Sequence, residues 1–330
     1  MAAGNHRALK IIGIVVGAIV GIAVVAVLGL NIYMRTAFAP FFDRAESPFD
    51  IPGINTGFVP QDLDHVEADD SWLFSGYMAD HSPSPLYRRT ADGTITKFYV
   101  SLPDGSPYDG HGSAITTNEQ YAYLACEEGY LVIPMDDLLF AEDGASVQAT
   151  EKVDVDLSPA FMNIEQGQLL LGNFYYPNDY ETPENHHITT PDGTENPAVM
   201  YAFAADPAEP GRFLTVPDNV FSIPGMVQGT CITDDGRIVL SVSYGIAPSH
   251  LLAYNVNLAA PDGTFTTGSG DEVELFCLDS RNLTEDLVGP PMQEGIESHD
   301  GRVYTTDESA SNKYIFGKLC GAGRVYAVQL

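Results

Sequence analysis

A chain of 330 residues with 45% hydrophobic and 18% charged residues is long enough for one large globular domain and an attachment device. Residues 1–35 hold three of the 15 basic residues and none of the 45 acidic ones, so the remainder carries 12 bases against 45 acids, a balance of −33. Such a charge repels nucleic acid and anionic lipid, which excludes nucleic-acid binding as the function. A well-solvated surface explains the acidity most simply, and a cationic partner is the alternative.

The first predicted element is a membrane span. Residues 11–30, "IIGIVVGAIVGIAVVAVLGL", form an unbroken apolar run of the length that crosses the hydrocarbon core as a helix. Arg7 and Lys10 precede it and favour a cytoplasmic amino terminus, so the sequence predicts a single-pass cell-membrane protein whose later residues lie outside. A cleavable signal peptide is the alternative, but its only A-x-A motif ends next to Pro40, which favours a retained signal anchor.

The lipid bilayer is therefore an expected partner of this segment. Gly13, Gly17 and Gly21 repeat the small-xxx-small spacing that lets two membrane helices approach closely, so a homodimer through these glycines is one interpretation. The ordinary tolerance of membrane helices for glycine is the other. The sequence predicts three parts: a cytoplasmic stub and signal anchor over 1–35, a linker over 36–47, and an extracytoplasmic domain over 48–330.

The outer part reads as short strands in repeated units. Segments such as "SWLFSGYM", "QYAYLACE" and "RIVLSVSY" are aromatic and β-branched, and each follows a turn or a polar break. Asp-Gly pairs, the commonest signal of tight hairpins, begin at 92, 104, 109, 143, 192, 235, 262 and 300. The units begin near residues 59, 110, 158, 226 and 291, a spacing that leaves room for four strands each.

The ends of the chain indicate a closed ring. The fifth unit stops after its third strand at "GRVYAVQL", whereas "FDIPGINTGFVPQ" near 49–61 resembles "FSIPGMVQ" before the fourth unit. The amino-terminal segment is expected to supply the missing strand, which removes exposed sheet edges. The predicted fold is an all-β, five-bladed β-propeller behind one transmembrane helix, with residues 179–197 as a polar insertion. Six blades are the alternative if a wide gap hides a weak unit.

Three stretches carry a resemblance to known proteins. "VPQ…SWLFSGYM", "VQG…SVSYG…SHLLAY" and "EGIE…GRVYTTDESASNKY" resemble a group of uncharacterised β-propellers from Gram-positive bacteria, within the superfamily of bacterial extracytoplasmic propellers. The resemblance spans most of the outer domain and implies a fold and a location, but no established activity. Quinone-dependent dehydrogenase propellers match poorly, because their blade-linking tryptophans are missing and Trp72 is the only tryptophan.

The four cysteines form no CxxC motif and no zinc-type cluster. An extracytoplasmic setting permits disulfides, and Cys277 with Cys320 is the favoured pair because both lie in the last third of the chain. The alternative is that all four cysteines, Cys126 and Cys231 as well as this pair, are buried thiols.

Residues that begin the units should meet the ends of the second strands at one funnel, because in a propeller both lie on the same face. The ligand-binding residues predicted by this rule are Gln61, Tyr77, His111, Asn173, Gln228, Tyr244 and Glu294. Amides, rings and a carboxylate suit a polar ligand such as a sugar. Alternatively, such side chains only satisfy backbone groups or water in the channel.

Catalytic candidates are carboxylates alone. Glu294 with Glu308, or Asp62 with Glu294, provides the acid pair of a glycoside hydrolase, although a chain this acidic offers many such pairs. His111 with nearby carboxylates is a candidate for a divalent cation, the one cofactor considered. Histidines 186 and 187 are expected to be exposed in a loop, and no nucleophile-elbow or phosphate-loop motif occurs.

Two functions follow from these patterns. The first is a membrane-anchored propeller that binds a surface glycan or an envelope protein through its funnel. The second is an extracytoplasmic hydrolase, glycosidase-like or lactonase-like, that uses the funnel carboxylates. A scaffold in envelope assembly is a third interpretation, and the sequence leaves open whether the protein is an enzyme.

Overall fold

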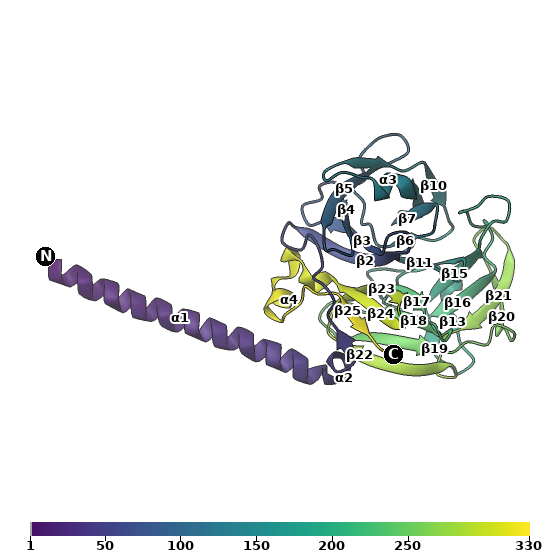
Figure 1. Ribbon diagram of the computed structural model, residues 1–330. Coiled ribbons are helices and arrows are strands. Elements are labelled where there is room, and N and C mark those ends of the chain that lie inside the picture. The colour runs from purple at the N-terminus through teal and green to yellow at the C-terminus, as the bar shows by residue number, and fades with distance from the viewer. Residues whose placement is uncertain (1) are drawn as a thin grey trace.

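The computed structural model describes residues 2–330, with side chains from Lys10 onward. Five small β-sheets form a ring, and one long helix, α1 (Ala2–Ala37), projects from it (Figure 1). The predicted fold, an all-β five-bladed propeller behind an apolar helix, is confirmed. The described residues form no sixth blade, so the wider gaps in the repeat spacing are insertions.

Each blade is an antiparallel sheet, and two blades are extended at the outside. Blade 1 is β2 (Phe58–Val66), β3 (Ser71–Met78), β4 (Pro85–Arg89) and β5 (Ile95–Ser101), with β9 (Ser146–Gln148) added in parallel. Blade 2 is β6 (Ile115–Thr117), β7 (Tyr121–Cys126), β8 (Gly129–Pro134) and β10 (Glu151–Asp154). Blade 3 is β11 (Phe161–Glu165), β12 (Gln168–Gly172), β15 (Ala198–Ala204) and β16 (Asn219–Ile223), extended by β21 (Glu272–Cys277) and β20 (Gly263–Thr266).

The last two blades complete the ring. Blade 4 is β17 (Val227–Ile232), β18 (Ile238–Val242), β19 (Ser249–Tyr254) and β22 (Leu283–Gly289). Blade 5 is β23 (Gln293–His299), β24 (Arg302–Asp307), β25 (Tyr326–Val328) and β1 (Ala45–Glu46). The inner strands β2, β6, β11, β17 and β23 contact one another in this order, and β23 contacts β2. They therefore surround a central channel.

Short segments lie outside the blades. The helices are α2 (Ala39–Phe42), α3 (Met135–Leu139) and α4 (Ile315–Leu319), with 3-10 turns η1 (Glu184–His186), η2 (Glu308–Ala310) and η3 (Asn312–Tyr314). The predicted polar insertion contains η1 and a small hairpin, β13 (Ile188–Thr189) with β14 (Glu195–Asn196).

The amino-terminal segment closes the ring, but at a different place from the one expected. Ala45 and Glu46 pair with β25, whereas residues 51–57 turn instead of extending. Gly53 and Gly57 have φ of +73° and +91°, a left-handed backbone that breaks a strand. The closing strand is therefore β1, upstream of the segment that resembles "FSIPGMVQ". Residues 36–47, expected to be a linker, contain both α2 and β1.

Four of the Asp-Gly pairs, at 92, 192, 235 and 300, lie in turns between paired strands, whereas those at 109, 143 and 262 do not. Asp300 and Gly301, between β23 and β24, have φ of +50° and +71°, the positive values that a two-residue hairpin of type I′ requires. The hydrophobic core is divided in the same repeating way, since five apolar clusters each lie between two neighbouring blades. Phe41 of α2 is fully buried in the cluster between blades 4 and 5. Burial of such a ring contributes about 2 kcal/mol to the closure.

Helix α1 is apolar over most of its length. Lys10–Ala37 spans 28 residues, and its most apolar 18-residue window has a mean hydropathy of 3.1, so the helix is long and apolar enough to cross a bilayer. At 1.5 Å per residue it is about 42 Å long, more than the roughly 30 Å of a hydrocarbon core. Asn31 near its end donates a hydrogen bond of 2.7 Å to the carbonyl of Leu319 in α4. The dimer predicted through the three glycines stays a prediction.

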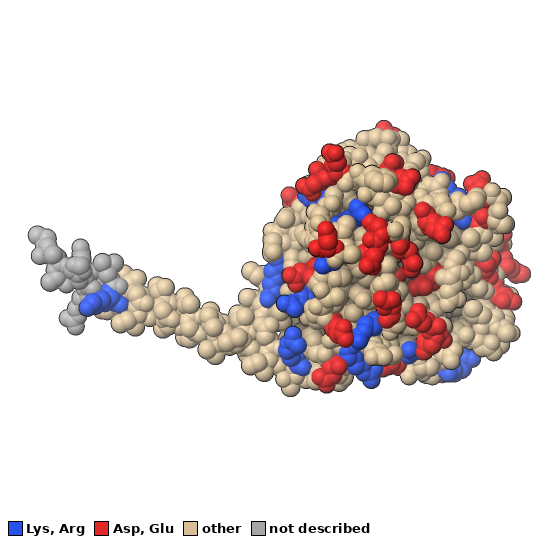
Figure 2. All heavy atoms as spheres, in the orientation of Figure 1, with Lys and Arg blue, Asp and Glu red and all other residues tan. Residues whose placement is uncertain are grey.

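Acidic residues are distributed unevenly between helix α1 and the propeller. Acidic side chains are spread over the visible face of the propeller, whereas the described part of α1 carries none (Figure 2).

All four cysteines are free thiols, so the predicted disulfide between Cys277 and Cys320 is wrong. Cys277 lies in β21 at blade 3 and Cys320 follows α4 at blade 5, because nearness in sequence does not set position around a ring.

Candidate functional site

A cavity of about 1310 Å³ opens on the face where the inner strands begin. The second strands of the blades, or the residues that follow them, end at the same cavity, as the propeller rule predicts. All seven predicted ligand-binding residues line it: Gln61, Tyr77, His111, Asn173, Gln228, Tyr244 and Glu294. The catalytic candidate Glu308 lines it as well.

Three of these side chains enter the cavity from β-bulges. The pairing register shifts at Gln61 in blade 1, at Gln228 in blade 4 and at Glu294 in blade 5. A bulge inserts one unpaired residue and re-aims its side chain, and bulges are common next to active sites. The repeat alignment found these positions but gave no indication of the bulges.

Glycines next to two of the bulges let the inner strands approach closely. A Cβ atom at Gly229 would lie 2.8 Å from the amide nitrogen of Ile296, and one at Gly295 would collide with Asp62. The pairs Gln228-Gly229 and Glu294-Gly295 therefore combine a polar side chain at the cavity with a close contact between blades. This answers why the sequence places a glycine after each polar residue.

One wall of the cavity is a network around Tyr77. Its ring stacks on His111 with centroids 4.3 Å apart, and its hydroxyl donates to Glu308 at 2.9 Å. Lys313 bonds to the same hydroxyl and lies over the Tyr77 ring at 4.8 Å. The oxygen Oε1 of Gln61 is 2.6 Å from Nε2 of His111, so the bulged amide orients the imidazole.

This network fixes protonation states. His111 is exposed toward the cavity, but desolvation by the surrounding side chains, followed by the charge of Lys313, lowers its pKa to about 4. Burial raises the pKa of Glu308, while Tyr77 and Lys313 favour its anion and limit the rise. The imidazole is therefore neutral near pH 7 and able to accept or donate one hydrogen bond.

Two polar groups in the cavity are not used by the protein. The side chains of Gln228 and Glu294 form no hydrogen bond with any described residue, although Glu294 is only 3% exposed. Burial raises the pKa of Glu294 well above its usual range, and the charges of Glu308 and Asp307 raise it further. Glu294 is buried and Gln228 is half-buried, and the polar atoms of both side chains are free to bond to a ligand in the cavity.

Two other candidates are occupied. Asp62 lies outside the cavity lining, and its carboxylate accepts the amides of Leu63 and Ile115, each at 2.9 Å. It therefore joins blade 1 to blade 2. Asn173 accepts the amide of Val199 at 3.0 Å and is 2.9 Å from Nδ1 of His186. Both polar groups of Asn173 are thus used within the protein.

A second wall contains aromatic rings from the polar insertion and its surroundings. Tyr176 stacks on Tyr244 with centroids 3.9 Å apart, and the Tyr244 hydroxyl donates to Asp179 at 2.6 Å. Phe174 and Tyr180 also line the cavity. The expectation that His186 is exposed is wrong: it is 3% exposed, and burial lowers its pKa to about 4. The insertion is therefore packed against blade 3 as part of the cavity wall.

Some residues of the cavity walls were not predictable from the repeat: Lys313 and Tyr314, which follow the second strand of blade 5, and the tyrosines around 176–180. Lys313 and Tyr314 belong to a segment that no other unit contains, so the repeat alignment had nothing to compare them with. The run "NFYYPNDY" is rich in tyrosine and was the one available signal for the second wall.

Below the cavity, polar side chains of the inner strands close the channel. We call this set the channel cluster; its members are Asp64, Thr116, Asn163, Glu165 and Glu297. Asn163 accepts from Thr116 at 3.3 Å and donates to the carbonyl of Thr230 at 3.0 Å and to Glu297 at 2.7 Å. It thus joins blade 3 to blades 2, 4 and 5.

Of the carboxyl groups in the channel cluster, that of Asp64 is buried, and those of Glu165 and Glu297 are half-buried. Burial raises the pKa of Asp64 and of Glu165 to about 7, and that of Glu297 well above its usual range. Asp64 and Glu165 each accept a hydrogen bond from a neighbouring blade: Asp64 from Thr117 at 2.6 Å, and Glu165 from the amide of Ile232 at 2.9 Å. The cluster therefore has partners where Gln228 and Glu294 have none.

Comparison with solved structures gives low similarities. A protein from Thermus thermophilus, proposed to be an oxidoreductase of the glucose dehydrogenase type, is 12% identical; the match covers 86% of this chain and 99% of that chain, with a TM-score of 0.45. The PQQ-bound aldose sugar dehydrogenase of Streptomyces coelicolor is 12% identical over 86% of this chain and 97% of that chain, with a TM-score of 0.43.

A proposed 6-phosphogluconolactonase from Bacteroides uniformis is 11% identical over 75% of this chain and 78% of that chain, with a TM-score of 0.38. No protein-family model and no curated protein matches the sequence. TM-scores below 0.5 do not establish a shared activity, so the chemistry of the site follows from its own residues. The resemblance to propellers of Gram-positive bacteria stays a prediction.

Proposed function

We propose that the protein is a membrane-anchored propeller whose cavity binds a carbohydrate. The observation that carries this proposal is the pair of unpartnered polar groups, Gln228 and Glu294, in a cavity bounded by two aromatic stacks. Sugars present hydroxyl groups to amides and carboxyl groups and present C–H faces to rings. Among the residues that line the cavity, His111, Phe174, Tyr180 and Tyr244 supply the rings.

The size and charge of the cavity narrow the ligand. Its volume of about 1310 Å³ exceeds the range typical of drug-sized ligands, which favours an oligosaccharide over a single sugar unit. Five acidic residues line it, against two lysines: Asp109, Glu127, Glu181, Glu294 and Glu308 against Lys152 and Lys313. A neutral sugar or an amino sugar fits this balance better than a sugar phosphate or a uronic acid.

The anchor supports a ligand near the membrane surface. Asn31 of α1 bonds to Leu319 of α4, and Lys313 and Tyr314 of the cavity wall lie just before α4. The apolar side chains Ile315 and Phe316 are 68% and 40% exposed beside the anchor helix. Combined with the positive residues before the span, this supports an extracytoplasmic propeller held close to the bilayer, with a glycan of the cell surface as its ligand.

Titration of the full chain in lipid nanodiscs with neutral, amino and acidic oligosaccharides tests the proposal. Neutral or amino sugars should bind, and Gln228→Ala should weaken binding about tenfold, because one hydrogen bond to a sugar contributes about 1.5 kcal/mol. Gln120→Ala, at an exposed glutamine outside the cavity, is the matched control. No binding to any sugar, or equal weakening in both variants, contradicts the proposal. Binding of an envelope protein in place of a sugar would favour the interpretation that the cavity binds a protein partner.

A hydrolase is the second candidate, and the state of Glu294 favours it. A carboxyl group with a raised pKa can donate a proton to a leaving group, and Glu308, held by Tyr77 and Tyr314, can act as the carboxylate partner. Glu294→Gln should then retain ligand binding and lose turnover by at least about a hundredfold. If the wild-type protein binds a sugar without cleaving it, the hydrolase proposal is contradicted and only the binding function remains.

A further inference from the structure

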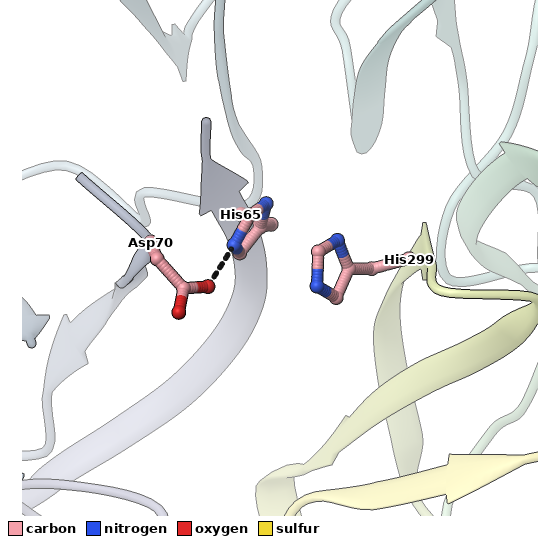
Figure 3. A group of neighbouring side chains, drawn as sticks. All are labelled: His65, Asp70 and His299. Atoms are coloured by element: carbon pink, nitrogen blue, oxygen red, sulfur yellow. Dashed lines mark hydrogen bonds and ion pairs between the residues drawn. The ribbon is translucent and has the colours of Figure 1, made fainter. Parts of the chain in front are cut away.

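Two histidines and an aspartate meet at the end of the channel opposite the cavity (Figure 3). The inner strands β2 and β23 begin at the cavity and end here, with His65 near the end of β2 and His299 at the end of β23. Asp70 lies in the turn that leads from β2 to β3. The three residues therefore join blade 1 to blade 5, the two blades between which the ring closes.

The donor atoms of these residues are close together. Nε2 of His65 is 2.9 Å from Oδ1 of Asp70, and one ligand atom from each of the three residues lies within 4.8 Å of the others. Donors that bind one ion at about 2.1 Å are roughly 3 to 3.5 Å apart. Side-chain rotations that bring the three donor atoms closer together would place them around one ion.

The residues around the site favour a cation, and the two imidazoles limit which metal ions can bind. The His65 side chain is only 6% exposed, and its ring lies 3.7 Å from the His299 ring between centroids. Asp300 adds a carboxylate 3.5 Å from Nε2 of His299. Imidazole nitrogen is a ligand for zinc and its neighbours in the first transition series, whereas calcium and magnesium prefer oxygen alone.

We propose that His65, Asp70 and His299 bind a divalent transition-metal ion of the zinc type. Two imidazoles and one carboxylate are three protein ligands, which leaves a fourth position for water or for Asp300. The ion connects the first and last blades and so stabilises the closed ring independently of the cavity. Without an ion, the same residues form a His–Asp hydrogen bond and a ring stack.

Trp72 provides a direct readout, because it is the only tryptophan and its ring lies 5.1 Å from His65 and 5.7 Å from His299 between centroids. The full chain in nanodiscs is titrated with Co²⁺, which quenches tryptophan emission and absorbs visible light when bound by nitrogen ligands. We expect saturable quenching at one ion per chain, reversed by Zn²⁺ and by a chelator but not by Ca²⁺. Zn²⁺ should also raise the Tm.

Two variants separate the site from general metal binding. His299→Gln and Asp70→Asn should each weaken Co²⁺ binding at least about tenfold; asparagine tolerates the left-handed backbone of Asp70, whose φ is +54°, so this variant keeps the turn. His250→Gln is the matched control, since His250 pairs with Asp286 at 2.7 Å outside this group. Quenching that does not saturate, or equal affinity in wild type and Asp70→Asn, overturns the proposal.

Discussion

The cavity and the channel cluster are built from the same kind of residue on the same inner strands, yet they differ in how those residues are satisfied. Asn163 bonds to three other blades, whereas Gln228 and Glu294 bond to none of the described residues. Gln228 is half-buried and Glu294 faces the cavity, so a ligand or solvent in the cavity can satisfy both side chains. The difference teaches that polarity in the channel stabilises the ring and polarity in the cavity is available to a ligand.

The largest effect is expected at the centre of the channel cluster. Asn163→Ala removes the partner of Glu297 and of two buried carbonyl groups, and should lower the free energy of unfolding by about 3 kcal/mol. Denaturant unfolding followed by Trp72 emission measures it. Asn255→Ala, at an exposed asparagine, should change stability by less than about 0.5 kcal/mol. A loss below about 1 kcal/mol at Asn163 would show that the cluster is not what holds the inner strands.

The next effect concerns the close approach of the inner strands. A Cβ atom at Gly295 would lie 2.7 Å from the Cα of Asp62, so Gly295→Ala should destabilise the protein by about 2 to 3 kcal/mol. Gly263→Ala in β20, where nothing lies within 4 Å, is the control and should be nearly neutral. A tolerated Gly295→Ala in thermal unfolding would mean that blades 1 and 5 are less tightly joined here.

Buried carboxyl groups make stability depend on pH. The folded pKa of Asp64, Glu165 and Asp307 is about 7, above the value near 4 of an unfolded chain. The folded state therefore binds more protons between about pH 4 and 7, and the free energy of unfolding should fall as the pH rises through this window. Hydrogen bonds lower the pKa of Asp92 to about 2, so this residue affects stability only below about pH 4.

Glu165→Gln isolates one contribution. Glutamine keeps an oxygen for the amide of Ile232 but does not titrate, so the loss of stability between about pH 5 and 7.5 should shrink by about 2 kcal/mol. Asp218→Asn, at an exposed aspartate, should leave the pH dependence unchanged. The Tm of each variant is measured between about pH 5 and 7.5. A wild-type Tm that rises with pH in this range would contradict the raised pKa values of these carboxyl groups.

The smallest effect on stability is expected in the cavity. Gln228→Ala removes no hydrogen bond to a described residue, so the free energy of unfolding should change by less than about 0.5 kcal/mol while ligand binding falls. The contrast with Asn163→Ala is the sharpest test of the comparison. A large loss of stability at Gln228 would place it with the channel cluster.

Much of the fold was predictable from local patterns. The alternation within "SWLFSGYM" and the Asp300-Gly301 pair predict a strand and a hairpin, because a two-residue period and a positive φ are properties of short segments. The seven cavity residues followed from the repeat, since symmetry places equivalent positions on one face. The partner of each residue was not predictable in this way: Asn173 was a candidate of the same repeat rule as Gln228, and Asp62 was a catalytic candidate, but backbone amides on other strands take up their oxygens.

The sequence by itself determined an apolar span, a repeat of four short strands and the face on which Gln61, Gln228 and Glu294 meet, because periodicity and length are local quantities. Only the tertiary structure decided that β1 closes the ring, that Lys313 joins the cavity wall, and that His65 meets His299 from the far end of the chain. These contacts depend on the distance around a closed ring. That distance is set by packing between blades, which no single stretch of the sequence contains.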